Sequence, residues 1–156
     1  DYFVDIQGDE PLINPEHIDK VVNYHSNNDH DIVLPHIFTN KIINEHIVKV
    51  VDSGGKVLYL TRANCPYPFR GESQLKKHLS IISFTPRALR MYAKMPESAL
   101  ERAEGVELLR AIENNLTIGT FELSGDSFSV DTGQDYANAL EAMKSDKLFQ
   151  QYSLDQ

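Results

Sequence analysis

The sequence predicts an α/β fold in which helices pack on a mixed sheet. Short runs rich in β-branched and aromatic residues alternate along the chain with segments whose apolar residues recur at helical spacing. Two of the strands meet at a Gly-rich turn, which indicates an antiparallel hairpin within an otherwise alternating order. The length of 156 residues suits one domain, 1–156, with a core of its own.

Strands are expected where apolar runs are bounded by turn residues. They cover residues 2–6, 31–38, 47–51, 56–60, 79–84 and 116–123. The first strand, bounded by Gly8 and Pro11, is predicted to be buried. The turn 52–55 joins the third strand to the fourth and makes the hairpin. The polar connection 39–46 is expected to be helical or irregular.

Helices are expected where a capping residue precedes apolar residues at helical spacing. They cover residues 15–25, 86–94, 99–113 and a last segment that follows 131–135 and ends near 144. Pro15 and Pro86 each follow a capping side chain and suit the first helical position. Ser98 and Glu101 have the spacing of a capping box. No element is predicted in the polar tail 145–156.

Composition narrows the function. The chain has 15 Lys and Arg against 23 Asp and Glu, a formal net charge of −8, which disfavours nucleic acid and anionic lipid as partners. Small phosphorylated substrates remain open, because carboxylates can bind them through a divalent cation. No apolar run approaches the roughly 18 residues of a membrane span, and no signal peptide is recognised. The single Cys65 suits a reducing cytoplasm and excludes a Cys-rich zinc module.

Two aspartates are candidates for a metal site. Asp9 follows the first strand, and Asp131 lies between a β segment and the last helix. Ligands of α/β sheets bind at the carboxyl ends of strands, where two carboxylates can share a Mg²⁺ ion. Each has a plainer alternative. Asp9 can belong to an ordinary turn with solvated acids, and the pattern alone favours Asp131 and Thr132 as caps of the last helix.

Other polar residues are weaker candidates. Arg62 ends a hairpin strand and can pair with a carboxylate or phosphate, although such an arginine is more often a surface charge. His78 has no second histidine at zinc-ligand spacing. Glu101, Glu104 and Glu107 recur every three residues on the predicted helix, and only one of them is expected to face a site.

Six segments, taken together and in order, resemble a known family. They are Gln7–Ile13, Asn44–Val51, Tyr59–Ala63 with Pro66 and Tyr67, Lys77–Leu79 with Ile81, Ser98–Glu101 with Glu104, Glu107 and Arg110, and Val130–Thr132 with Asp135. They are similar to 3-deoxy-manno-octulosonate cytidylyltransferase, the CMP-Kdo synthetase family of Gram-negative bacteria. The resemblance extends to about residue 142.

The resemblance implies a Rossmann-like nucleotidyltransferase fold with an inserted β-hairpin region through which a homodimer forms. It also implies Mg²⁺-dependent transfer of CMP from CTP to the anomeric hydroxyl of a 3-deoxy-2-ulosonic acid. This reaction releases pyrophosphate and supplies lipopolysaccharide or capsule assembly in the cytoplasm.

The resemblance also assigns roles to residues. Asp9 and Asp131 match the catalytic, metal-binding aspartates. Four residues match the family positions that contact the sugar, namely Gln7, Arg62, His78 and Glu107. Arg62 is expected to pair with the carboxylate of the sugar.

Three positions depart from the family pattern. Ile82 replaces a tyrosine of the pocket, Leu108 replaces a sugar-contacting glutamine, and Gly133 replaces a proline at the start of the last helix. Losing two hydrogen-bonding groups should weaken polyol binding or favour another acid. Two alternatives therefore stay open: a non-catalytic binding or assembly module of this fold, and a cytidylyltransferase for a sialic-type sugar or a phosphonate.

The family also has an upstream strand and a basic, Gly-containing loop that binds CTP, and neither is found in these 156 residues. We therefore expect a C-terminal portion of a nucleotidyltransferase domain. By itself, this portion should neither bind CTP tightly nor turn it over.

Overall fold

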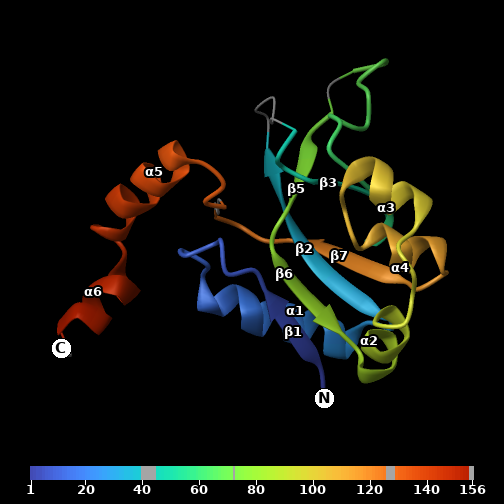
Figure 1. Cartoon of the computed structure of the whole chain (residues 1–156), viewed down its shortest axis with the longest axis horizontal. Coiled ribbons are helices and arrows are strands. Elements are labelled where there is room, and N and C mark those ends of the chain that lie inside the picture. The colour runs from blue at the N-terminus through green and yellow to red at the C-terminus, as the bar shows by residue number, and fades with distance from the viewer. Residues whose placement is uncertain (40–44, 72, 126–128, 155–156) are drawn as a thin grey trace.

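The computed structural model describes residues 1–39, 45–71, 73–125 and 129–154 (Figure 1). The strands are β1 Phe3–Ile6, β2 Ile32–Thr39, β3 Lys49–Ser53, β4 Lys56–Thr61, β5 Leu75–His78, β6 Ile81–Phe84 and β7 Ile118–Glu122. The helices are α1 Pro15–Asn27, α2 Pro86–Tyr92, α3 Ala99–Glu104, α4 Leu109–Glu113, α5 Gly133–Met143 and α6 Lys147–Leu154. The predicted α/β class with a mixed sheet is confirmed.

The sheet is built around β2. One edge of β2 pairs in parallel with β7, from Ile32 opposite Ile118 to His36 opposite Glu122. The other edge pairs antiparallel with β6 and then with β5. The hairpin β3–β4 is present as predicted and pairs with β5 on one side and β7 on the other. Strands β2, β5, β3, β4 and β7 therefore form a closed ring of pairings, in which Lys49 of β3 lies between Thr61 at the end of β4 and Lys77 of β5.

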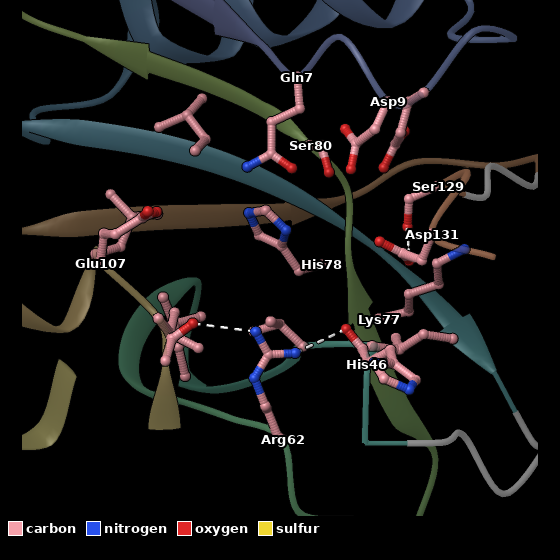
Figure 2. A pocket seen from close by; sticks show the side chains of 18 residues that line it. Gln7, Asp9, His46, Arg62, Lys77, His78, Ser80, Glu107, Ser129 and Asp131 are labelled. Carbon is pink, nitrogen blue, oxygen red and sulfur yellow. Dashed lines mark hydrogen bonds between the residues drawn. The ribbon is translucent and has the colours of Figure 1, made fainter. Parts of the chain in front are cut away.

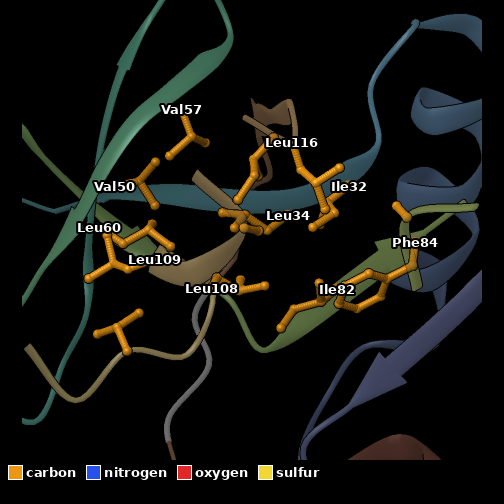
Figure 3. Packing of buried hydrophobic residues seen from close by; sticks show 14 residues of the cluster. Ile32, Leu34, Val50, Val57, Leu60, Ile82, Phe84, Leu108, Leu109 and Leu116 are labelled. Carbon is orange, nitrogen blue, oxygen red and sulfur yellow. The ribbon is translucent and has the colours of Figure 1, made fainter. Parts of the chain in front are cut away.

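Apolar side chains of β2 alternate between two cores, because successive residues of a strand point to opposite faces. Ile32 and Leu34 join the cluster beneath α2 and α4, which also includes Leu60, Ile82 and Leu108 (Figure 3). Val33 and Ile37 join a second cluster beneath α1, and their neighbours there are Val21, Leu79, Ile81 and Leu123. The sheet is thus covered by helices on both faces, as Figure 1 shows.

The helix caps agree with the sequence predictions. The side chain of Asn14 accepts a hydrogen bond from the amide of Glu16, and Thr85 accepts one from Ala88. Both capping-box hydrogen bonds between Ser98 and Glu101 are present.

Three predicted elements are wrong in extent or environment. The strand β1 was expected to be buried, but it lies at an edge and leaves Phe3 53% exposed. The predicted strand 79–84 is shorter, since β6 covers Ile81–Phe84, and residues 75–78, for which no strand was predicted, form the separate strand β5 between β2 and β3. The predicted helix 99–113 is two helices, because Gly105 has a φ of 61° and ends α3 in the left-handed conformation.

The C-terminal segment lies apart from the sheet (Figure 1). The helix α5 buries Ala139, and α6 occupies part of the tail in which no element was predicted. Residues 40–44, which belong to the connection predicted to be helical or irregular, lie outside the described residues. Among the residues that the structure describes, no helix has the length and apolar character needed to cross a membrane.

Candidate functional site

The site is a cavity of about 320 Å³ next to the turn that follows β1 (Figure 2). Its lining comes from that turn, the segment before β3, the ends of β4 and β5, the corner between α3 and α4, and the segment before α5. All six residues predicted for the site line it, namely Gln7, Asp9, Arg62, His78, Glu107 and Asp131. The structure therefore brings together side chains that are far apart in the sequence.

Asp9 and Asp131 lie on two segments that are joined by their backbones. The carbonyl oxygen of Asp9 accepts a hydrogen bond of 2.9 Å from the amide of Val130. The carboxylate of Asp131 accepts one of 3.0 Å from the hydroxyl of Ser129. Both aspartates are exposed at the cavity. The expectation that the two carboxylates reach the same site is met.

Two roles were considered for the segment before α5, a cap of the helix and a place in the site, and the structure divides them between Thr132 and Asp131. Thr132 caps the helix, since its hydroxyl accepts from the amide of Asp135, and Asp135 completes a capping box. The side chain of Asp131 is not one of the two capping side chains and lines the cavity instead.

The donor chemistry of the two aspartates fits a Mg²⁺ ion. Magnesium prefers oxygen ligands and is usually held by one or two carboxylates together with water and substrate phosphates. Within the described ranges, no group of three or more His, Cys, Asp or Glu is placed to hold a metal. An ion at Asp9 and Asp131 would therefore complete its coordination with water and substrate, as Mg²⁺ does.

His78 on β5 presents an unsatisfied nitrogen. Its Nε2 atom is buried and has no hydrogen-bond partner in the described part of the chain. Burial, with a smaller contribution from the charge of Lys77, lowers the pKa of His78 to about 4. The imidazole is therefore neutral near pH 7. A buried polar atom without a partner is costly, so a ligand that supplies one would gain binding energy there.

Arg62 does not have the free fork that pairing with a sugar carboxylate requires. Its Nε donates to the carbonyl of Glu104 at 2.7 Å, and its Nη2 donates to that of Gly105 at 3.0 Å. Its Nη1 donates to the carbonyls of Glu45 at 3.1 Å and His46 at 2.9 Å. All three guanidinium nitrogens thus donate to backbone carbonyls, in four hydrogen bonds.

Two charged residues outside the predicted site, Glu104 and Lys49, hydrogen-bond to the backbone of Arg62. The carboxylate of Glu104 accepts from the amide of Arg62 and the hydroxyl of Thr61, both at 2.8 Å. Burial acts to raise the pKa of Glu104, but these hydrogen bonds, with one from Tyr59, hold it below its usual range. Lys49 is 0% exposed, and its Nζ donates to the carbonyls of Ile47 and Arg62.

The three glutamates spaced by three residues have three different roles. Glu101 is paired with Arg110 and belongs to the capping box, Glu104 holds the end of β4, and Glu107 lines the cavity. Only one of them faces the site, as expected. They do not share a helix face, however, because Gly105 ends α3 before Glu107.

Two of the three positions that depart from the family pattern form part of an apolar wall. Ile82 and Leu108 are each 6% exposed, line the cavity and belong to the cluster of Figure 3. Leu60 and Val106 extend the same lining. The cavity therefore combines a buried apolar wall with a polar rim.

Comparison with known proteins gives a consistent result. The sequence model of the cytidylyltransferase family matches residues 1–118. A curated 3-deoxy-manno-octulosonate cytidylyltransferase from Rickettsia canadensis is 35% identical over 142 residues, 89% of this chain and 57% of that protein. One of the same name from Rickettsia bellii is 34% identical over 150 residues, 94% of this chain and 60% of that protein. The chain thus spans less than two thirds of the length of these relatives.

Solved structures agree with the fold. The structure of CMP:2-keto-3-deoxy-manno-octonic acid synthetase complexed with CTP matches with a TM-score of 0.83 and 28% identity, covering 92% of this chain and 63% of that one. An inositol-1-phosphate CTP transferase from T. maritima matches with a TM-score of 0.57 at 16% identity, covering 86% of this chain and 51% of that one, which shows a shared fold alone. The Rossmann-like nucleotidyltransferase fold predicted from the sequence is confirmed.

Proposed function

The chain belongs to the cytidylyltransferase family, and we propose that its cavity serves the transfer of CMP from CTP to the anomeric hydroxyl of a 3-deoxy-2-ulosonic acid. Pyrophosphate is the second product. The names of the relatives support this reaction, since they are cytidylyltransferases of 3-deoxy-manno-octulosonate. The proposal concerns the protein at its full natural length.

The observation that carries the proposal is the meeting of two kinds of group in one cavity of about 320 Å³. Asp9 and Asp131 supply the carboxylates that a metal–triphosphate complex requires. His78, Gln7 and Glu107 supply polar groups for the hydroxyls of a sugar acid. A nucleotidyl transfer needs both kinds of group within reach of the same reacting atoms.

Mg²⁺ is the proposed cofactor, with Asp9 and Asp131 as its protein ligands. Bound there, it would neutralise phosphate charge during the transfer. The chain's own residues orient the acceptor. The neutral imidazole of His78 forms a hydrogen bond with one hydroxyl, and Gln7 and Glu107 bind other hydroxyls of the acceptor. The apolar wall at Ile82 and Leu108 keeps water from this side of the cavity.

The same family membership supports a cytoplasmic enzyme that supplies lipopolysaccharide or capsule assembly as a homodimer formed around the β3–β4 hairpin. Sedimentation of the full-length protein tests the dimer, for which we expect twice the monomer mass. A hairpin variant such as Leu58→Glu, at a side chain that is 51% exposed, should then shift the protein to the monomer.

The decisive experiment is turnover by the full-length protein. CTP and a panel of acids, namely Kdo, deoxygenated 3-deoxy-2-ulosonic acids, a sialic acid and a phosphonate, are incubated with Mg²⁺, and pyrophosphate and CMP-sugar are quantified. Product with at least one 3-deoxy-2-ulosonic acid, lost on chelation of the metal, is the expected result. Turnover of the sialic acid or phosphonate alone would favour the related transferase. Binding of the acids without any turnover would favour the non-catalytic module.

A further inference from the structure

We propose that Arg62 is a positioning residue that joins two walls of the cavity, and that it does not bind the carboxylate of the acceptor. The structural part of this inference stands on the geometry of the free protein. The part about the acceptor rests on the proposed function.

The guanidinium of Arg62 lies between two segments that are remote in sequence. On one side it donates to the carbonyls of Glu45 and His46, at 3.1 and 2.9 Å. On the other side it donates to those of Glu104 and Gly105, at 2.7 and 3.0 Å. Figure 2 shows the side chain reaching both walls below the ring of His78.

The base of the side chain is itself held in place. The amide of Arg62 donates to the carboxylate of Glu104 at 2.8 Å, and its carbonyl accepts from the buried ammonium of Lys49. Glu104 therefore accepts two hydrogen bonds from Arg62. The carboxylate of Glu104 accepts from the amide of Arg62, and the carbonyl of Glu104 accepts from Nε of Arg62. Such a residue has little freedom to turn toward a ligand.

The two walls carry the residues that shape the cavity. Gly105 adopts the left-handed corner at the end of α3, and Glu107 and Leu108 follow within the same connection. On the opposite side, Ile47 and Val48 follow the segment that Arg62 holds, and they line the cavity too. Releasing the guanidinium would free both walls and change the separation between Glu107 and His78.

Direct pairing with a carboxylate would require a different arrangement. A bidentate pair uses two parallel N–H groups of the fork. Because all three nitrogens of the guanidinium already donate to carbonyls, turning the fork toward a ligand would leave carbonyl oxygens without donors. Lysine cannot replace this function, because its three N–H groups all belong to one nitrogen atom and cannot reach carbonyls on both walls.

The first test measures hydrogen exchange in the ligand-free, full-length protein. In Arg62→Lys we expect the amides of residues 105–110 and 46–49 to exchange faster by on the order of tenfold. The matched control is Arg87→Lys, which alters an exposed arginine paired with Asp31 and should leave these amides unchanged. Unchanged exchange in Arg62→Lys would overturn the proposed clamp.

The second test separates positioning from direct contact. The ratio of kcat/KM for an acceptor acid to that for its carboxamide is measured in the wild type and in Arg62→Lys. We expect kcat/KM to fall for both acceptors, while their ratio stays within about twofold. If Arg62 bound the carboxylate, the ratio would collapse toward one by about 10- to 100-fold in the variant. That collapse would overturn the inference.

Two further variants keep the tests decisive. Arg62→Gln, which keeps two donors, replaces the lysine variant if the latter does not fold. Gly105→Ala strains the corner at its φ of 61° and leaves the guanidinium intact, so it should lower kcat/KM without changing the ratio. A wild-type protein inactive on every acid would reject the proposed function, whereas the exchange measurement would still decide the clamp.

Discussion

The carbonyl oxygen of Asp9 accepts a 2.9 Å hydrogen bond from the amide of Val130, so the turn after β1 and the segment before α5 lie side by side. This contact is between backbones and therefore does not depend on either carboxylate. Asp9 and the neighbour of Val130, Asp131, can be substituted one at a time without removing the bond that brings them together. The proposed metal site can for this reason be tested cleanly by mutation.

Asp9→Asn and Asp131→Asn should each lower metal-dependent pyrophosphate release by the full-length protein on the order of 100-fold or more, because each removes one charged oxygen ligand. The concentration of Mg²⁺ that gives half-maximal activity should rise as well. The control Asp19→Asn changes an exposed carboxylate of α1 and should leave both quantities unchanged. Wild-type activity in either site variant, at low Mg²⁺, would contradict the proposed ligand set.

Ile82→Tyr combined with Leu108→Gln should shift acceptor preference toward Kdo, because the double variant returns hydrogen-bonding groups to the cavity wall. Both positions are 6% exposed, so the change should also cost about 1–3 kcal/mol of unfolding free energy. The measurement is kcat/KM for Kdo relative to a more deoxygenated acid, with urea unfolding in parallel.

The matched control for this pair is Leu116→Gln, which has the same 6% exposure in the same cluster but does not line the cavity. It should lose stability without a change in preference. An unchanged preference in the double variant would mean that these two positions do not select the sugar.

His36 should make the protein less stable in mild acid. Burial and the charge of Lys76 lower its pKa to about 4, against an opposing effect of Asp52, whereas the unfolded histidine has a pKa of 6.5. The unfolded chain therefore binds more protons between these values, so the unfolding free energy falls as the pH drops from 6.5 toward 4. This histidine should contribute a loss of about 2 kcal/mol between pH 7 and pH 5.

Urea unfolding of the wild type and His36→Gln at several pH values measures this effect. Glutamine can keep a hydrogen bond to Thr120, whose Oγ1 lies 2.7 Å from Nδ1 of His36, but it does not titrate. The variant should therefore lose a smaller fraction of its stability between pH 7 and pH 5. Equal pH dependence in the two proteins would show that His36 is not responsible.

Lys49→Met should destabilise the protein by about 1–3 kcal/mol, because the carbonyls of Ile47 and Arg62 lose a buried donor. Lys56→Met on the neighbouring strand alters an exposed lysine and should stay within about 0.5 kcal/mol of the wild type. Chemical unfolding followed by circular dichroism compares the two variants. Equal stability of both would mean that the buried ammonium contributes nothing to the fold.

Much of the local structure could be predicted because it depends on near neighbours in the chain. Caps at Asn14 and Thr85, the capping box at Ser98 and the hairpin turn at residues 54–55 are as expected. Each involves backbone geometry and hydrogen bonds within a few residues, which composition and spacing describe well.

The wrong predictions concern segments whose conformation depends on contacts with distant parts of the chain. The strand β5 contains Lys76, Lys77 and His78, a run with no strand pattern, and it forms because β2 and β3 pair with its two edges. The helix predicted over 99–113 is interrupted at Gly105, whose left-handed conformation turns the chain beside Arg62.

The amino-acid sequence by itself determined the α/β class, the main caps and turns, the family, and the six residues that line the cavity. The tertiary structure alone decided how those residues are used. Among the described residues, it showed Arg62 engaged by backbone carbonyls, His78 with an unpartnered Nε2, and the side chain of Asp131 at the cavity while that of Thr132 caps α5. The reason is physical: residue types and spacing record which groups are available, whereas hydrogen-bond partners and burial depend on segments brought together only by folding.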